Sequence, residues 1–147
     1  MGTKQEYSSC FDEDLLVGIK VDAMREVTAG SEVTPVPLSS PLVSGLLNLR
    51  GQIVTEIDLR RCLELGDRPA NQPPVHVIMW TDEGCVSLLV DQVGEVLQVD
   101  DDDFETSPRT LRGRLRELIT GAYKLDGRLL LVLDTDRVLA CSTSHET

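Results

Sequence analysis

The sequence has few aromatic residues, no long apolar runs and no closely spaced cysteines. Aromatic residues make up only 3% of the chain, so branched aliphatic side chains, which pack well on β-sheets, must fill the core. No run approaches the roughly 20 apolar residues of a membrane-spanning helix, and the first residues lack the apolar segment of a signal peptide. The four cysteines have no C-x-x-C spacing, which predicts reduced thiols in a cytoplasmic protein.

The balance of charge is strongly acidic. The 147 residues include 25 acidic and 14 basic side chains, and the formal net charge is −11. Nucleic-acid binding depends on cationic neutralisation of phosphates, and docking on anionic membranes also needs basic residues. We therefore predict a soluble chain with no nucleic-acid partner and no direct membrane insertion, of a length that suits one domain or two small halves.

The sequence also lacks the patterns of catalysis and of cofactor binding. It contains no G-x-S-x-G elbow, no P-loop and no G-x-G-x-x-G motif. His76 and His145 have no obvious nucleophile or metal-ligand partner, and Asp100–Asp103 lacks the alternating ligands of a calcium loop. We predict no catalytic residue, no cofactor and no metal ligand. An enzyme or a metal-binding β-barrel domain is the competing class, which bound metal or substrate turnover would favour.

The stretch that organises the chain is Gly45–Arg60. Its apolar residues run up to a tight turn at Arg50 and Gly51, because glycine accepts a positive φ without steric cost. A second apolar segment follows, and Asp58 is a good N-cap for the short helical pattern behind it. The stretch therefore predicts a strand, a turn, a second strand and a capped helical turn.

The chain contains this stretch twice. Residues 43–63 align without a gap with residues 119–139, including the glycines, the turn and the capping aspartate. Upstream of each copy, residues 17–27 resemble residues 86–96. Two similarities in the same order indicate a duplicated β unit, and two copies are too few for a solenoid.

Turn residues and hydrophobic periodicity predict the other elements. Alternating or continuous apolar segments between polar turns favour strands, and apolar residues at helical spacing favour short helices. Prolines and polar residues near the middle of the chain are typical of a linker. The expected segments are strands at 6–11, 15–19, 75–80 and 85–90, helical turns at 21–27, 41–43 and 109–118, and a linker at 66–74. Residues 93–99 are expected to form either a further strand or a helical turn that passes into one.

The block Val43–Arg60 resembles that of a known family. It is similar to the G-x-x-N-L-R-G-x-I-x-P-x-x-D-L-R block of the CheW-type chemotaxis coupling proteins, which contain the CheW-like domain. Weaker similarities lie at residues 25–27, 89–97 and 121–139, so that the resemblance spans essentially the whole chain. The block with its N-L-R-G and D-L-R parts is the more specific piece.

The resemblance implies a fold and a domain organisation. The fold would be mostly β, with two SH3-like five-stranded β-barrel subdomains and a few short helices around a shared hydrophobic core. Residues 1–147 would form a single CheW-like domain made of two pseudo-repeated subdomains. These would cover approximately residues 15–68, with the return of the terminal strands, and residues 74–140.

The resemblance also implies a function. The protein would be a non-enzymatic scaffold or adaptor that couples chemoreceptors to the histidine kinase CheA in bacterial chemotaxis. Its partners would be the regulatory domain of CheA and the cytoplasmic tip of methyl-accepting chemotaxis receptors. It would be cytoplasmic, located at membrane-associated receptor arrays through these partners. The alternative is a CheW-like coupler in another receptor–kinase pathway, such as twitching motility or developmental signalling.

Arg50 is the first candidate site residue, because the second copy has Asp126 at the same place. The family pattern implies that Arg50 pairs with Glu26, which at a surface would shape a groove more than add stability. Asn48 either bonds a partner backbone or caps its own turn, and both readings stay open. By position, the groove that receives the receptor tip between the barrels would be lined or bordered by Met24, Val27, Gly45, Leu47, Asn48 and Arg50. Two of these, Met24 as a core residue and Gly45 as a backbone requirement, also have a purely structural interpretation.

Overall fold

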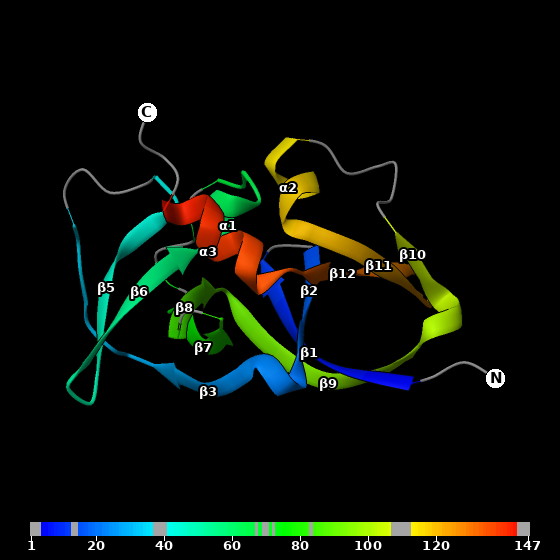
Figure 1. Ribbon diagram of the computed structural model, residues 1–147, viewed down its shortest axis with the longest axis horizontal. Helices are drawn as coiled ribbons and strands as arrows, with labels where there is room; N and C mark the ends of the chain where they lie inside the picture. The colour runs from blue at the N-terminus through cyan, green and yellow to red at the C-terminus, as the bar shows by residue number, and fades with distance from the viewer. Residues whose placement is uncertain are drawn as a thin grey trace.

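The computed structural model describes residues 4–12, 15–36, 41–66, 68, 71, 73–82, 84–106 and 113–143, and these are mostly β (Figure 1). Within this part of the chain, no helix has both the length and the apolar character needed to cross a membrane. The first half contains β1 (Lys4–Asp12), β2 (Leu15–Lys20), a 3-10 helix (Val21–Ala23), β3 (Met24–Ala29), β4 (Val33–Thr34), β5 (Val43–Leu49), β6 (Gln52–Asp58) and α1 (Leu59–Cys62). The second half contains β7 (Val75–Thr81), β8 (Gly84–Val90), β9 (Gln92–Asp100), a 3-10 helix (Asp101–Asp103), β10 (Phe104–Thr106), α2 (Gly113–Leu118), β11 (Ile119–Leu125), β12 (Arg128–Leu133) and α3 (Thr135–Thr143).

The strands form two sheets with the same internal order. One sheet runs β10-β11-β12-β2-β1-β9 and the other β4-β5-β6-β8-β7-β3. In each sheet one pair near the centre is parallel, β12 with β2 and β6 with β8, and the other pairs are antiparallel. The predicted mostly β, SH3-like fold is confirmed. Each sheet has six strands where five were predicted, because a short edge strand, β4 or β10, pairs with the five longer ones.

The N-terminal hairpin and the middle hairpin are exchanged between the sheets. Hairpin β1–β2 lies beside β9 and β12, whereas β7–β8 lies beside β3 and β6. Each sheet therefore combines segments that are distant in sequence, and Figure 1 shows β1 and β2 crossing toward the C-terminal strands. The division into subdomains at 15–68 and 74–140 stays a prediction.

The two aligned segments take the same shape. Hairpins β5–β6 and β11–β12 both carry a register shift in their first strand, just before Gly45 and just before Gly121. Each is followed by a helix whose N-terminus receives an aspartate side chain. Asp58 Oδ1 accepts from the backbone N–H of Arg60 at 2.9 Å, and Asp134 Oδ1 accepts from that of Arg137 at 3.1 Å. The predicted N-cap at Asp58 is thereby confirmed.

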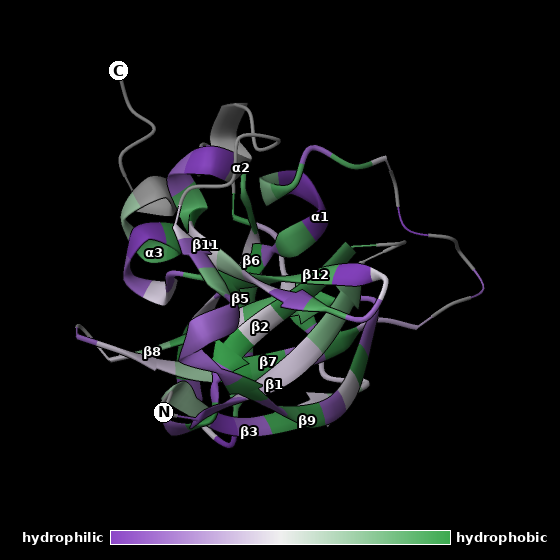
Figure 2. Ribbon diagram, turned by 90° about the vertical axis from the view of Figure 1, so that its right-hand side faces the viewer, coloured by the Kyte–Doolittle hydropathy of each residue, from purple (hydrophilic) through white to green (hydrophobic). Residues whose placement is uncertain are grey.

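The core has a shared part and two smaller parts. The shared part takes residues from both sheets and all three helices, among them Val17, Ile57, Leu88, Leu118 and Val138. Each sheet also encloses a small apolar cluster of its own. Figure 2 shows the apolar strands gathered in the interior and the more polar helix surfaces outside. The shared part explains how two sheets of moderate size form one stable unit, because buried apolar area grows with the size of the common core.

Two predicted elements need correction, and a third is confirmed in the part that the structure describes. The helical turn predicted over 21–27 is only a 3-10 turn at its start, and the rest is β3, since pairing with β7 satisfies its backbone. The helical turn predicted through Val43 is wrong, because Val43 already pairs with Ile57 in β5 and β6. The helix predicted at 109–118 is confirmed from Gly113 to Leu118. Its first part, like Ser39 and Ser40 of the other prediction, lies outside the described residues.

Candidate protein-binding site

The turn between β5 and β6 places Arg50 at the surface. Arg50 has φ 50° and Gly51 has φ 90°, so both residues adopt positive φ. Gly51 does so without a Cβ penalty, whereas the conformation is uncommon for arginine. The Arg50 side chain is 66% exposed, and the strands on either side alternate between buried and more exposed residues. The turn therefore presents a guanidinium group beyond the end of the sheet.

Arg50 and Glu26 form an ion pair with two hydrogen bonds. Arg50 Nη1 donates to Glu26 Oε1 at 3.1 Å and Nη2 donates to Oε2 at 2.5 Å. Such a two-point contact fixes the plane of the guanidinium group as well as its position. The hydrogen bond from Arg50 lowers the pKa of Glu26, and burial opposes this only in part. The same bond raises the pKa of Arg50.

The pKa of Glu26 gives a direct measurement of this pair. Arg50→Ala is expected to raise the pKa of Glu26 toward its ordinary value, because it removes the hydrogen bonds that stabilise the carboxylate. Since the folded-state pKa is lowered, the pair is intact at neutral pH and is lost as the pH falls through that pKa. A carboxyl-detected NMR titration measures this. Arg25→Ala is the control, because Arg25 lies 3.6 Å from Glu26 and acts mainly through its charge. An equal or larger shift in that control would contradict the assignment.

A second arginine connects this pair with the only tryptophan of the sequence. Arg25 Nη1 donates to Gln52 Oε1 at 3.2 Å, and the Arg25 guanidinium lies 5.2 Å from the ring centre of Trp80. Trp80 is 48% exposed. We call Arg25, Glu26, Arg50, Gln52 and Trp80 the Arg50 surface. It spans three strands and the β5–β6 turn, and it combines an accessible aromatic ring with two oriented guanidinium groups, a composition typical of protein interfaces.

Sequence reasoning did not find Arg25 and Trp80 as site residues. Arg25 belongs to the short Arg-Glu-Val similarity at residues 25–27, and Trp80 lies at the end of a strand predicted for its apolar run. Their proximity depends on the pairing of β3 with β7, which no local pattern indicates. A lone tryptophan in a chain poor in aromatic residues was the available signal.

Asn48 caps its own turn. Its Oδ1 accepts a hydrogen bond from the backbone N–H of Gly51 at 2.9 Å, as expected if Asn48 caps its own turn. The Asn48 side chain is exposed, so its amide group is still accessible. A direct contact of Asn48 with a partner stays a prediction.

Gly45 has a steric role. A Cβ at this position would lie 2.3 Å from the carbonyl oxygen of Thr34 in β4, and its φ is 154°. Gly121 has the same relation to β10, where a Cβ would lie 2.7 Å from the carbonyl oxygen of Glu105. In both sheets the glycine therefore lets a short edge strand lie close to the hairpin.

The other predicted groove residues differ in their access to solvent. Leu47 is fully buried and packs in the small core of its sheet with Val54 and Ile78, so it supports the surface from below. Met24 is half-buried against the shared core, and Val27 is 45% exposed. The structure brings together Glu26 with Arg50 and places Asn48 in the same turn. A groove between the two sheets formed by the whole set stays a prediction.

The chain is similar to known proteins over most of its length. A family model described as "CheW-like domain" matches residues 11–142. The chain belongs to the CheW-like domain family. The chemotaxis protein CheW of Thermotoga maritima is 30% identical over 135 residues, which cover 92% of this chain and 87% of that protein. The chemotaxis protein CheW of Rhizobium meliloti is 30% identical over 129 residues, 86% of this chain and 81% of that protein.

A solved structure supports the fold independently. The scaffolding protein TtCheW from Thermoanaerobacter tengcongensis has a TM-score of 0.80 with this chain at 23% identity, with 90% of each chain covered. At this identity the similarity concerns the fold. The similarity extends over both sheets, because 90% of the chain is more than the residues of either sheet alone.

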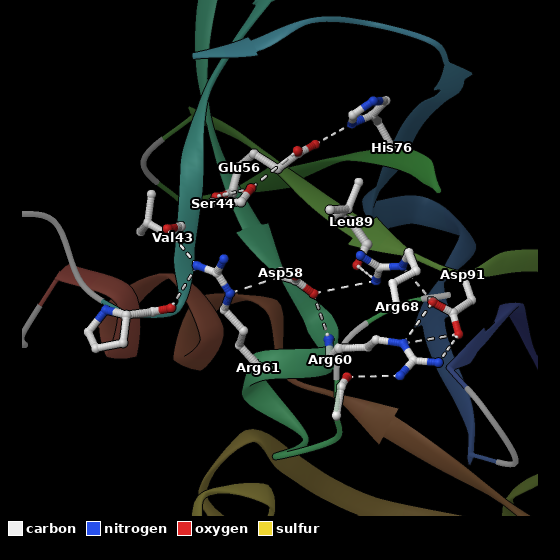
Figure 3. Close-up of polar contacts among 12 residues, drawn as sticks. Val43, Ser44, Glu56, Asp58, Arg60, Arg61, Arg68, His76, Leu89 and Asp91 are labelled. Atoms are coloured by element: carbon white, nitrogen blue, oxygen red, sulfur yellow. Dashed lines mark hydrogen bonds and ion pairs between the residues drawn. The ribbon is translucent and has the colours of Figure 1, made fainter. Parts of the chain in front are cut away.

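At the end of β6 that is opposite the Arg50 turn, this CheW-like domain contains a buried ion-pair network (Figure 3). Arg60 Nη2 donates to Asp91 Oδ2 at 2.8 Å, and Arg68 Nε donates to Asp91 Oδ1 at 2.6 Å. The side chains of Arg60 and Asp91 are almost fully buried. Arg68 also contacts Asp58 at 3.4 Å, so the network joins the end of β6 to the residue that follows β8. Sequence reasoning recognised Asp58 as a cap but not these ion pairs.

Proposed function

We propose that this protein is a non-enzymatic scaffold that couples chemoreceptors to the histidine kinase CheA in chemotaxis signalling. The observation that carries the proposal is the family match over residues 11–142, within which the N-L-R-G turn presents Arg50 in a fixed pair with Glu26. Relatives that share most of their length with this chain are named chemotaxis protein CheW, and TtCheW is named a scaffolding protein. A scaffold needs rigid surfaces for two partners, which a domain with two sheets and one shared core can supply.

The proposed partners are the cytoplasmic tip of methyl-accepting receptors and the regulatory domain of CheA. The receptor tip would bind at the Arg50 surface together with Met24 and Val27. The kinase domain would bind elsewhere, so that both partners are held at once at a receptor array. The protein then acts by fixing their geometry, and its own residues carry out no chemical step.

Binding measurements with the two partners test the proposal. The purified chain is expected to bind both a soluble receptor-tip fragment and the kinase regulatory domain in calorimetric titrations. Arg50→Glu is expected to weaken receptor-tip binding by at least about tenfold, because it breaks the pair and places two carboxylates together. Kinase binding should change little, since the kinase is expected on another surface.

The second copy supplies a matched control. Asp126→Ala changes the turn at the same place in the other hairpin and is expected to leave receptor binding unchanged. The exchange Glu26→Arg with Arg50→Glu re-forms an ion pair and should recover part of the loss. If Glu26→Ala and Arg50→Glu both bind the receptor tip as the unaltered chain does, the Arg50 surface is not the receptor site. If neither partner binds, the scaffold function itself is wrong.

A further inference from the structure

A second polar cluster lies inside the sheet that contains β5 and β6. Glu56 of β6 is fully buried, and three side chains from three other strands contact its carboxyl group. Figure 3 shows two of them, Ser44 and His76. Ser87 Oγ donates to Glu56 Oε2 at 2.9 Å and Ser44 Oγ donates to Oε1 at 3.3 Å. His76 Nδ1 forms the third and shortest contact. With the two serine hydroxyls as donors, the Glu56 side chain accepts at both of its oxygens, as a carboxylate does.

The fold does not require this charge, because the other sheet does without it. Glu56 pairs with Gly45 across the hairpin, and in the other sheet Val132 pairs with Gly121. His76 of β7 pairs with Leu89 of β8. At the equivalent position of the other sheet, Tyr7 of β1 pairs with Lys20 of β2. The same backbone therefore accommodates a valine where Glu56 stands. A buried carboxylate is costly to desolvate, so its presence in one sheet alone points to a use for it.

The cluster forms the inner wall of a cavity. This cavity has a volume of about 310 Å³, and Gly30 and Pro73 at its rim are exposed. His76 is only 4% exposed, and among the described residues its only hydrogen-bond partner is Glu56. Figure 3 shows the other edge of the imidazole, with Nε2, turned away from Glu56.

We propose that this cavity binds a small primary ammonium ion with a short alkyl group. In this proposal the Nδ1–H group of His76 donates a hydrogen bond to Glu56, and Nε2 is then the acceptor for the ammonium group. The hydroxyl oxygen of Ser44, whose proton is directed at Glu56, is a further acceptor. An ammonium group supplies up to three donors and the positive charge that the buried carboxylate lacks. Around it, Val33, Pro74 and Leu89 offer apolar contacts to the alkyl group, within a volume typical of ligand pockets.

No other charged side chain takes part. Among the lining residues only Glu56 and His76 are titratable, since β4, β5, β8 and the segments before β4 and β7 contribute apolar or hydroxyl side chains. The nearest acid along β6 is Asp58, which is engaged with Arg68. The charge of the cavity is therefore that of the Glu56 and His76 pair alone.

Calorimetry on the unaltered chain tests the proposal without any protein partner. Propylammonium is expected to bind one saturable site and to shift the side-chain ¹⁵N resonances of His76, whereas propanol and butyrate are not. If propanol binds equally, the site recognises the alkyl group alone and the proposal is wrong. Binding of butyrate in place of propylammonium would show that His76 carries the positive charge, which also overturns it. If none of the three compounds shows saturable binding, the proposal is also wrong.

Three variants locate the site. Glu56→Gln keeps the shape and removes the charge, and it is expected to weaken propylammonium binding by at least about tenfold. Val33→Phe introduces the residue that β10 has at the equivalent position, Phe104, and should block the cavity while leaving Glu56 and His76 intact. Tyr7→Phe alters the cavity at the equivalent place in the other sheet and is the control, with unchanged binding. Unchanged affinity in both Glu56→Gln and Val33→Phe would refute the assignment.

Discussion

Asp91→Ala is expected to lower the free energy of unfolding by about 3–5 kcal/mol, the usual cost of removing one partner from a buried ion pair. Asp91 accepts from two arginines, Arg60 at 2.8 Å and Arg68 at 2.6 Å. Both Asp91 and Arg60 are almost fully buried, so water cannot readily replace the lost carboxylate. The variant leaves a guanidinium group in the interior without the charge that compensates it.

Urea unfolding followed by circular dichroism measures this effect, provided that the transition stays two-state. Asp22→Ala is a suitable control, because Asp22 occupies the same place in the upstream similarity but is exposed in a 3-10 turn. It is expected to change the free energy of unfolding by no more than about 0.5 kcal/mol. A loss below about 1 kcal/mol for Asp91→Ala would show that the network contributes specificity and little stability.

The elements that the sequence predicted well are those whose causes are local. The hairpin of β7 and β8 follows from two apolar runs around a polar turn, and the N-cap at Asp58 follows from one side chain and the helix behind it. The error at 21–27 has the opposite origin. Apolar residues spaced three apart there fit a helix, but the segment from Met24 onward pairs with β7 over six residues of strand. Tertiary pairing overrides a weak periodic signal.

The buried polar groups were not predictable, because they depend on strand order. The sequence alone indicates no partner for His76, yet it contacts Glu56 from β7, a strand that is separated from β6 by β8 in the sheet. The contact of Arg60 with Asp91 likewise needs the parallel pairing of β6 with β8. In the candidate site the same holds for Arg25 and Trp80. The duplicated sequence indicated which segments share a shape, but not that the hairpins β1–β2 and β7–β8 are exchanged.

Gly45→Ala is expected to lower the free energy of unfolding by about 2–5 kcal/mol. Part of this cost is the positive φ of residue 45, which disfavours any side chain, and part is overpacking. The new Cβ would lie 2.3 Å from the Thr34 carbonyl oxygen. Since the obstacle is backbone of β4, no rotamer change relieves it, and β4 must separate from β5, where Thr34 pairs with Leu46.

Gly51→Ala separates the two contributions. Gly51 also has positive φ, at 90°, but a Cβ there would meet no atom within 4 Å. Its expected cost is about 1–2 kcal/mol, from backbone strain alone. Chemical unfolding of both variants gives the difference, and amide exchange in β4 should rise only in Gly45→Ala, because only that substitution displaces the edge strand. Equal losses of stability, with β4 equally protected in both, would mean that β4 yields without cost and that Gly45 is required for its φ alone.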